Sequence, residues 1–231
     1  MKTVGIIGGI GPESTIEYYR LLIASYRKQN PDGGYPSIII NSVDLKKMIE
    51  LITAGNFAEV TDYLVNAVEK LARAGADFGA LAANTPHIVF DEIRARSSLP
   101  LISIVEATRE AAANLALNSV GLFGTRFTMQ GQFYPNVFSR AGIEIVVPEA
   151  VEQDYIHEHY MNELINGIFL PETRAGLLRI VDQLKEREGI AGLILGGTEL
   201  PLILKEPEHN GVAFLDTTRI HVNRIVGELM S

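Results

Sequence analysis

Short apolar segments alternate with amphipathic segments along the whole chain. Most of the short segments are continuously apolar, which is typical of strands that are covered on both faces. They predict strands at residues 4–7, 37–41, 78–82, 101–102, 120–123, 144–147, 192–195 and 212–215. The amphipathic segments predict helices at about 12–28, 57–74, 86–96, 105–117, 129–141, 152–166, 171–188 and 217–230. This alternation indicates right-handed βαβ units and parallel sheets.

The same pattern occurs twice. Val4-Gly5-Ile6-Ile7-Gly8 is matched 116 residues later by Val120-Gly121-Leu122-Phe123-Gly124, and the segment around Ala83 is matched 114 residues later around Gly197. Any two βαβ units look alike, but two signals with nearly the same separation favour an internal duplication. We therefore predict an α/β protein with two similar lobes, each a short parallel sheet flanked by helices, related by a pseudo-twofold duplication.

We place the first lobe at residues 1–99 plus about 211–231 and the second at about 100–210. A ligand cleft is expected between the lobes, because open α/β sheets bind ligands at the carboxyl ends of their strands. The loops that follow those strands are therefore the places to look for chemistry.

Composition narrows the function classes. A net charge of −8 over 231 residues argues against a protein that binds nucleic-acid phosphates. No apolar segment is long enough to span a membrane, and the N-terminal residues lead directly into a strand-like segment, so we expect a cytoplasmic protein. The chain contains no cysteine, which excludes disulfides, thiolate metal sites and thiol catalysis. No cluster at metal-ligand spacing occurs, so no metal is expected.

Two loops of the first lobe carry candidate residues. Gly8-Gly9-Ile10-Gly11 precedes Pro12, so its backbone and the following helix start favour either a small-anion site or a purely structural turn. The second loop is Ala83-Asn84-Thr85-Pro86-His87. Asn84 and Thr85 offer hydrogen-bonding groups, although Thr85 is also a suitable helix cap. His87 is either a catalyst or a packed histidine.

The second lobe has two corresponding loops. In Gly124-Thr125-Arg126-Phe127-Thr128-Met129, the threonines either bind a carboxylate or cap the following helix. In Gly196-Gly197-Thr198-Glu199-Leu200-Pro201, Glu199 is favourable at a helix start through the macrodipole alone. Glu199 is also a candidate for acid–base chemistry.

The strings GGIGPEST, AANTPH, GTRFTM and LGGTELP closely resemble those of the cofactor-independent aspartate/glutamate racemases. The resemblance spans almost the whole chain, with the same order and spacing. It implies two pseudo-symmetric α/β lobes and a small acidic amino acid, such as aspartate or glutamate, as substrate. It also implies a homodimer that uses neither metal, nucleotide nor pyridoxal phosphate.

The chain differs from this family at the two positions of the catalytic cysteines. The family resemblance implies two proton-transferring cysteines, one before Asn-Thr in the first lobe and one before Thr-Glu in the second. These positions are Ala83 and Gly197, and neither side chain can titrate. The two-thiol mechanism cannot operate in this chain. Restoring cysteine is expected to be harder at position 197, because a glycine at positive φ resists a side chain.

The substrate-binding positions are better retained, although a second basic residue of some aspartate racemases has no clear match around Ile165-Asn166-Gly167. The resemblance implies that Lys46 or Lys47 binds a distal carboxylate. The residues that remain to transfer protons are Thr85, His87, Thr198 and Glu199, of which histidine or a desolvated glutamate suits the task better than threonine. The positions implied to bind substrate are Gly8, Gly9, Ile10, Gly11, Asn84, Thr85, Thr125, Thr128 and Thr198.

Three functions are consistent with these residues. The first is an amino-acid racemase homologue that acts on an acidic amino acid through groups other than thiols. The second is a lyase, decarboxylase or isomerase of another small carboxylic acid on the same scaffold. The third is a ligand-binding homologue without catalytic activity. Fold alone does not decide among them, because function resides in the site.

Overall fold

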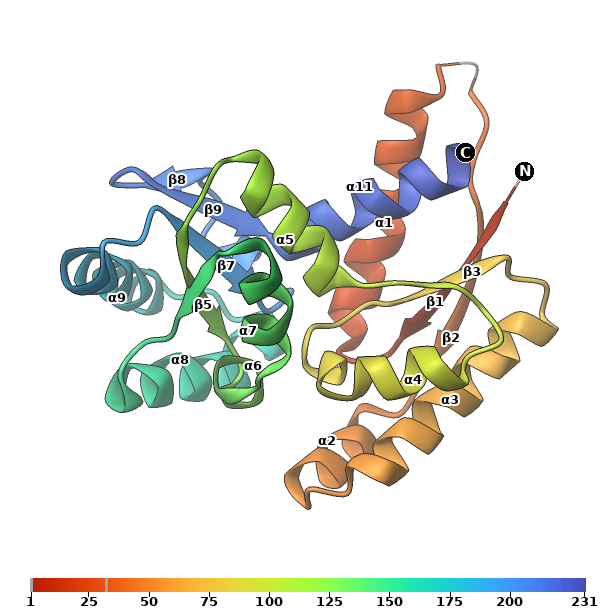
Figure 1. Cartoon of the computed structure of the whole chain (residues 1–231), viewed down its shortest axis with the longest axis horizontal. Coiled ribbons are helices and arrows are strands. Elements are labelled where there is room, and N and C mark those ends of the chain that lie inside the picture. The colour runs from red at the N-terminus through yellow and green to blue at the C-terminus, as the bar shows by residue number, and fades with distance from the viewer. Residues whose placement is uncertain (1, 32) are drawn as a thin grey trace. The chain divides into compact units, whose positions relative to one another are not determined.

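The computed structural model describes residues 2–31 and 33–231, and the chain divides into two compact units (Figure 1). The first unit comprises the residues up to Ile104 together with His221–Ser231. The second unit is the continuous segment Val105–Ile220. The second unit is therefore inserted, in sequence, between the main part of the first and its last helix.

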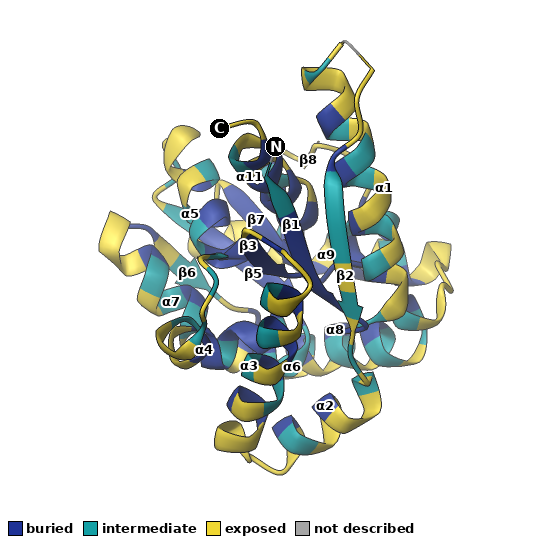
Figure 2. Cartoon of the chain, turned by 90° about the vertical axis from the view of Figure 1, so that its right-hand side faces the viewer, coloured by how far each residue is buried: buried dark blue, intermediate teal, exposed yellow. Residues whose placement is uncertain are grey.

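The first unit contains a parallel four-stranded sheet in the order β2-β1-β3-β4. The edge strand β2 is only half-buried, whereas β1 is buried along most of its length (Figure 2). The strand bounds are β1 Thr3–Gly8, β2 Ser37–Ser42, β3 Phe78–Leu81 and β4 Leu101–Ile102.

Helices cover both faces of this sheet (Figure 1). Tyr18, Leu22 and Tyr26 of one helix and the apolar face of the C-terminal helix pack with Val4 and Ile6 in one core cluster. On the opposite face, a Cβ at Gly5 would lie 3.0 Å from Leu71, so a third helix approaches the strand closely there. The helices are α1 Pro12–Gln29, α2 Leu45–Thr53, α3 Phe57–Arg73, η1 Thr85–Val89, α4 Phe90–Arg96 and α11 Thr217–Met230.

The second unit contains a sheet in the order β6-β5-β7-β9-β8, in which only the β8–β9 pair is antiparallel. The order β6-β5-β7-β9 repeats that of the first sheet, because in both sheets the first strand lies between the second and the third. The place that β4 has in the first sheet is taken here by β9, the last strand of the chain. The bounds are β5 Ser119–Gly124, β6 Glu144–Val146, β7 Gly192–Gly196, β8 Glu208–His209 and β9 Val212–Asp216.

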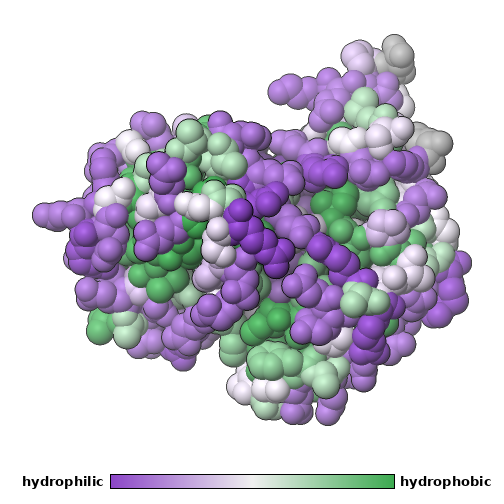
Figure 3. Space-filling view, viewed as in Figure 1, coloured by the Kyte–Doolittle hydropathy of each residue, from purple (hydrophilic) through white to green (hydrophobic). Residues whose placement is uncertain are grey.

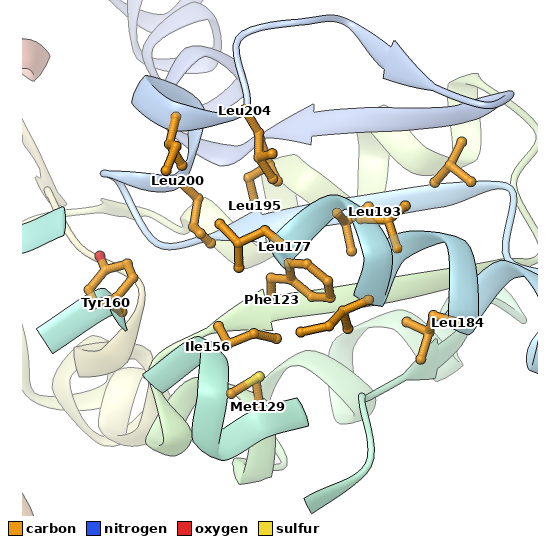
Figure 4. Packing of buried hydrophobic residues seen from close by; sticks show 14 of the residues in the cluster. Phe123, Met129, Ile156, Tyr160, Leu177, Leu184, Leu193, Leu195, Leu200 and Leu204 are labelled. Atoms are coloured by element: carbon orange, nitrogen blue, oxygen red, sulfur yellow. The ribbon is translucent and has the colours of Figure 1, made fainter. Parts of the chain in front are cut away.

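The core of the second unit is built from two helices that pack on one face of this sheet. Phe123, Leu193 and Leu195 of the strands contact Ile156 and Leu177, among other helical side chains (Figure 4). The helices of this unit are α5 Ile104–Asn114, α6 Arg126–Gln130, α7 Phe133–Phe138, η2 Ser139–Ala141, α8 Ala150–Asn162, η3 Leu164–Asn166, α9 Pro171–Glu188 and α10 Leu200–Ile203.

The predicted fold class is confirmed, since each unit is an α/β layer, with a parallel sheet in the first unit and a mixed, mostly parallel sheet in the second. The structure differs from the prediction in detail. The predicted helix at 129–141 is three short helices, and α2, α10 and β8 were not predicted. Residues 211–220 were assigned to the first lobe, but β9 pairs with β7 and belongs to the second unit.

Polar side chains predominate on the face shown in Figure 3, with smaller apolar patches among them. Within residues 2–31 and 33–231, no helix is both long enough and apolar enough to cross a membrane.

Candidate functional site

The Gly8–Gly11 loop links β1 to α1 and is held by one threonine. The Gly9 N–H donates to Thr15 Oγ1 at 2.8 Å, and Thr15 Oγ1 donates to the Gly11 carbonyl at 3.3 Å. Gly9 has φ of +86°, and a Cβ there would collide with the Val43 carbonyl, so only glycine fits. Gly8, Gly9 and Ile10 are buried and Gly11 caps α1 without a side chain. One of the predicted anion-binding N–H groups is thus already bonded within the loop.

The two candidate lysines lie on α2, directly after β2. The Asp44 carboxylate caps this helix, accepting from the Lys46 N–H at 2.8 Å and from the Lys47 N–H at 3.4 Å. The Lys46 side chain is 85% exposed and lies 3.9 Å from Glu50. The Lys47 ammonium lies 4.7 Å from the centroid of the Tyr63 ring. Both cations therefore remain at the surface of the first unit.

The Ala83–His87 loop follows β3 and leads into the 3₁₀ helix η1, which begins at Thr85 with Asn84 as its N-cap residue. Ala83, Asn84 and His87 are buried, and Thr85 is half-buried. The predicted capping position is therefore shifted by one residue, from Thr85 to Asn84.

His87 is enclosed by backbone groups. Its Nδ1 lies 3.1 Å from the Ala83 carbonyl, and the Ile104 N–H donates to its Nε2 at 3.4 Å. Its ring stacks on Phe90 with centroids 4.5 Å apart. Burial, with the nearby His221, lowers the pKa of His87 to about 3. With both ring nitrogens bonded to the backbone, this geometry favours the packed-histidine alternative over a catalytic one.

In the second unit, Thr125 and Thr128 form one cap. Thr125 Oγ1 accepts from the Thr128 N–H at 3.3 Å at the start of α6, and the two hydroxyl oxygens lie 3.2 Å apart. Thr128 is fully buried, whereas Thr125 is half-buried. The predicted capping role is present, and the half-buried Thr125 hydroxyl lies at the carboxyl end of β5, where a ligand is expected.

The loop after β7 brings together three buried polar side chains. Glu199 Oε2 accepts a hydrogen bond from the Thr198 hydroxyl at 2.8 Å and a second one from the hydroxyl of Tyr160, which lies on α8. All three side chains are less than 10% exposed. Burial, followed by the charge of Glu199, raises the pKa of Tyr160 well above its usual value. Thr198 and Glu199 were predicted as site residues, but Tyr160 was not.

Tyr160 fills the place of the missing side chain at position 197. A Cβ built on Gly197 would lie 2.8 Å from the Tyr160 hydroxyl oxygen and 2.9 Å from Cζ, and closer still to Cε2. Gly197 is not in the left-handed region of φ, so the expectation of a backbone barrier there was wrong. The barrier to a side chain is the phenol ring itself.

The sequence did contain one signal for this residue. Ile156 and Tyr160 on α8 and Leu164 on η3 recur every four residues and enter the same core cluster. A tyrosine on such an apolar stripe needs a partner for its hydroxyl once it is buried. Figure 4 shows Tyr160 at one end of the cluster.

No group of His, Asp and Glu side chains able to hold a metal ion occurs in the part of the chain that the structure describes.

Comparisons with known proteins agree on one family. The family model for Asp/Glu/Hydantoin racemases matches residues 7–225. A candidate Asp/Glu racemase from Yersinia pestis has a similar crystal structure, with a TM-score of 0.91, 32% identity and full coverage of both chains. The crystal structure of an aspartate racemase homologue from Pyrococcus horikoshii has a TM-score of 0.85 and 34% sequence identity, again with full coverage of both chains. The broad-specificity amino-acid racemase RacX of Bacillus subtilis is 29% identical over 171 residues, covering 73% of this chain and 71% of its own.

Proposed function

Because this chain belongs to the Asp/Glu/Hydantoin racemase family, we propose that it binds and acts on a small acidic amino acid such as aspartate or glutamate, without metal, nucleotide or pyridoxal phosphate. Racemases are isomerases, and the two-thiol relay is absent from this member of the family because the chain contains no cysteine. Proton transfer must therefore rely on other groups.

The observation that carries this proposal is the retention of four loops at the carboxyl ends of their strands. Two of them follow β1 and β3 in the first unit, and two follow β5 and β7 in the second. Parallel α/β sheets bind ligands at these strand ends, with helix N-termini favouring anions. We propose that the Gly8–Gly11 backbone contacts the ligand, together with the side chains of Asn84, Thr85, Thr125, Thr128 and Thr198.

Isothermal titration calorimetry tests the proposal directly. The wild-type protein is titrated with both enantiomers of aspartate and of glutamate, and with alanine as a ligand without a distal carboxylate. We expect at least one acidic amino acid to bind and alanine to bind more weakly. Absence of binding by all four acidic ligands would overturn the proposed substrate class.

The same titration tests the lysines. If Lys46 or Lys47 binds the distal carboxylate, its change to alanine should weaken binding about tenfold or more, because a hydrogen bond to a charged group contributes roughly 1.5–3 kcal/mol. Lys70→Ala, an exposed lysine on α3, is the matched control. Unchanged affinity in both Lys46→Ala and Lys47→Ala would exclude these two side chains as the carboxylate ligands.

We further propose that the protein is a cytoplasmic homodimer, as the family resemblance implies. Sedimentation equilibrium should give twice the chain mass of 25.3 kDa. Cell fractionation should recover the protein with cytoplasmic markers. A sedimentation mass of one chain would contradict the dimer.

A further inference from the structure

The second unit holds a titratable pair at the position where the family resemblance implies a thiol. Gly197 follows β7 and has no side chain, and the Tyr160 phenol occupies the volume where one would begin. The phenol oxygen lies 2.8 Å from the position of a Cβ at residue 197.

The hydrogen bonds around this oxygen suit proton transfer. Tyr160 and Thr198 both donate to the same atom, Glu199 Oε2. Both hydrogen bonds end on one carboxyl oxygen, which places an acceptor for the phenol proton directly beside Tyr160. The Thr198 bond fixes the carboxylate, and burial of all three side chains strengthens the interaction electrostatically.

We propose that Tyr160, with Glu199 as its proton acceptor, is the proton-transfer group of the second unit and stands in for the missing side chain at Gly197. This inference rests on the proposed function, because it assumes that an amino acid binds at these loops. It names the group that acts on that ligand.

This proton transfer needs no further reactant. The proton of the substrate α-carbon moves to the Tyr160 oxygen while the phenol proton moves to Glu199 Oε2. The Cα–H bond breaks, and its electron pair remains on the substrate, delocalised toward the α-carboxylate. Tyr160 ends as a neutral phenol and Glu199 as a neutral acid. Reversal returns a proton to the same face of the α-carbon.

The raised pKa of Tyr160 fits this concerted relay. A phenol with that pKa does not carry a free negative charge at neutral pH, so it transfers a proton only when a partner accepts one at the same time. Glu199 is that partner.

The corresponding loop of the first unit offers only weaker groups, because the hydroxyl of Thr85 is a poor acid or base at neutral pH. Ala83 cannot titrate, and both ring nitrogens of the nearby His87 are bonded to the backbone. Inversion needs an acid and a base on opposite faces, whereas the Tyr160–Glu199 pair serves one face. We therefore expect exchange of the α-proton with solvent in one enantiomer, with retention of configuration.

The test follows the α-proton signal of each enantiomer of aspartate and glutamate by proton NMR in deuterated water, with chiral chromatography of the product. Wild-type protein should exchange the α-proton of one enantiomer and form little of the other. Tyr160→Phe and Glu199→Gln should lower the exchange rate by about 100-fold or more, which is the usual contribution of a general acid–base group. Calorimetric affinity for the same ligand should change only a few-fold in both variants.

Tyr155→Phe is the matched control, because Tyr155 lies on the same helix and also loses only a hydroxyl. Its exchange rate should equal that of wild type. Thermal unfolding of each variant checks the fold, and Glu199→Gln keeps the test available if Tyr160→Phe does not fold.

The outcomes separate the two proposals. Ligand binding without any exchange, or exchange that persists in Tyr160→Phe, overturns the assignment of Tyr160 while leaving the proposed ligand intact. Rapid formation of both enantiomers also overturns it, because that would require a second proton-transfer group. Absence of binding by every acidic amino acid overturns the proposed function and, with it, this inference.

Discussion

At the scale of single residues, Gly197 and Tyr160 share one volume. A side chain at position 197 would come within 2.8 Å of the Tyr160 hydroxyl oxygen, so Gly197→Cys alone should overpack the site and lower the free energy of unfolding by roughly 1–3 kcal/mol. Combining it with Tyr160→Val should relieve the clash, and the two changes should couple favourably by about 0.5–3 kcal/mol. Urea denaturation of both single variants and the double variant measures this coupling.

Gly227→Cys is the control, since a Cβ at this glycine of α11 would meet nothing within 4 Å. It should leave stability nearly unchanged. Strictly additive effects of Gly197→Cys and Tyr160→Val would mean that the ring and the new side chain do not compete. In the Gly197→Cys/Tyr160→Val double variant, the further change Ala83→Cys restores a cysteine at both family positions. This triple variant tests whether the two positions still support racemisation.

The lowered pKa of His87 makes the stability of the protein depend on pH. Burial lowers its pKa to about 3, and burial likewise lowers the pKa of His221 to about 4. A histidine with a lowered folded-state pKa takes up a proton on unfolding, so its stabilising contribution is complete above about pH 6.5 and is lost as the pH falls toward the folded pKa. Below pH 6, stability should fall with a slope of up to about 1.4 kcal/mol per pH unit for each histidine.

His87→Asn should remove the contribution of His87 to this acid slope and leave that of His221 in place. Chemical denaturation between pH 7 and pH 4.5 measures both slopes. Equal slopes in the two proteins would show that the His87 pKa is not lowered by the fold.

At the scale of elements, α2 depends on its cap. Its buried residues are Met48 and Ile52, whereas none of residues 45–47 is buried, so packing holds the first turn of this short helix only weakly. Asp44 supplies the cap, accepting hydrogen bonds from the N–H groups of Lys46 and Lys47. Asp44→Ala should cost about 1 kcal/mol and raise hydrogen exchange in α2 selectively, whereas Glu50→Ala, on the same helix, should not. Unchanged exchange in α2 would show that packing on Met48 and Ile52 alone holds the helix.

The elements also explain what the sequence could predict. Central strands such as β1 and β7 are buried on both faces and therefore read as continuous apolar segments, so their positions were predicted to within a residue or two. The helix α2 has only two buried positions and shows no long apolar stripe. The antiparallel pair β8–β9 has two residues in its short strand, which is too short for a periodic signal.

Some residues of the candidate site could be predicted from the sequence and one could not. The loops follow strands, so Thr198 and Glu199 could be placed from the sequence. Tyr160 could not, because its partner Glu199 is 39 residues away and only tertiary packing brings the two together. Its helical spacing predicts burial, but the same spacing predicts an ordinary core residue.

At the scale of the whole molecule, the first unit is completed by the last helix. Val222, Ile225, Val226 and Leu229 of α11 are at most 4% exposed and belong to the first unit's core. Burial of such side chains contributes roughly 1.5–3 kcal/mol each, so the four together match the 5–15 kcal/mol stability of a typical domain.

Removing residues 221–231 should therefore unfold the first unit and leave the second folded. Hydrogen exchange with mass spectrometry should show lost protection in β1, β3 and α1 but retained protection in β5 and β7. Retained protection in β1 would contradict the assignment of α11 to this core.

This arrangement has a consequence for synthesis on the ribosome. The second unit is one continuous segment and has all of its own strands once residue 220 has emerged. The first unit begins earlier but waits for its final helix, whose His221 bonds to Tyr18 across 203 residues of chain. The half of the protein that is made first is thus the half that finishes folding last, and its exposed sheet is the surface that a nascent-chain chaperone would have to protect.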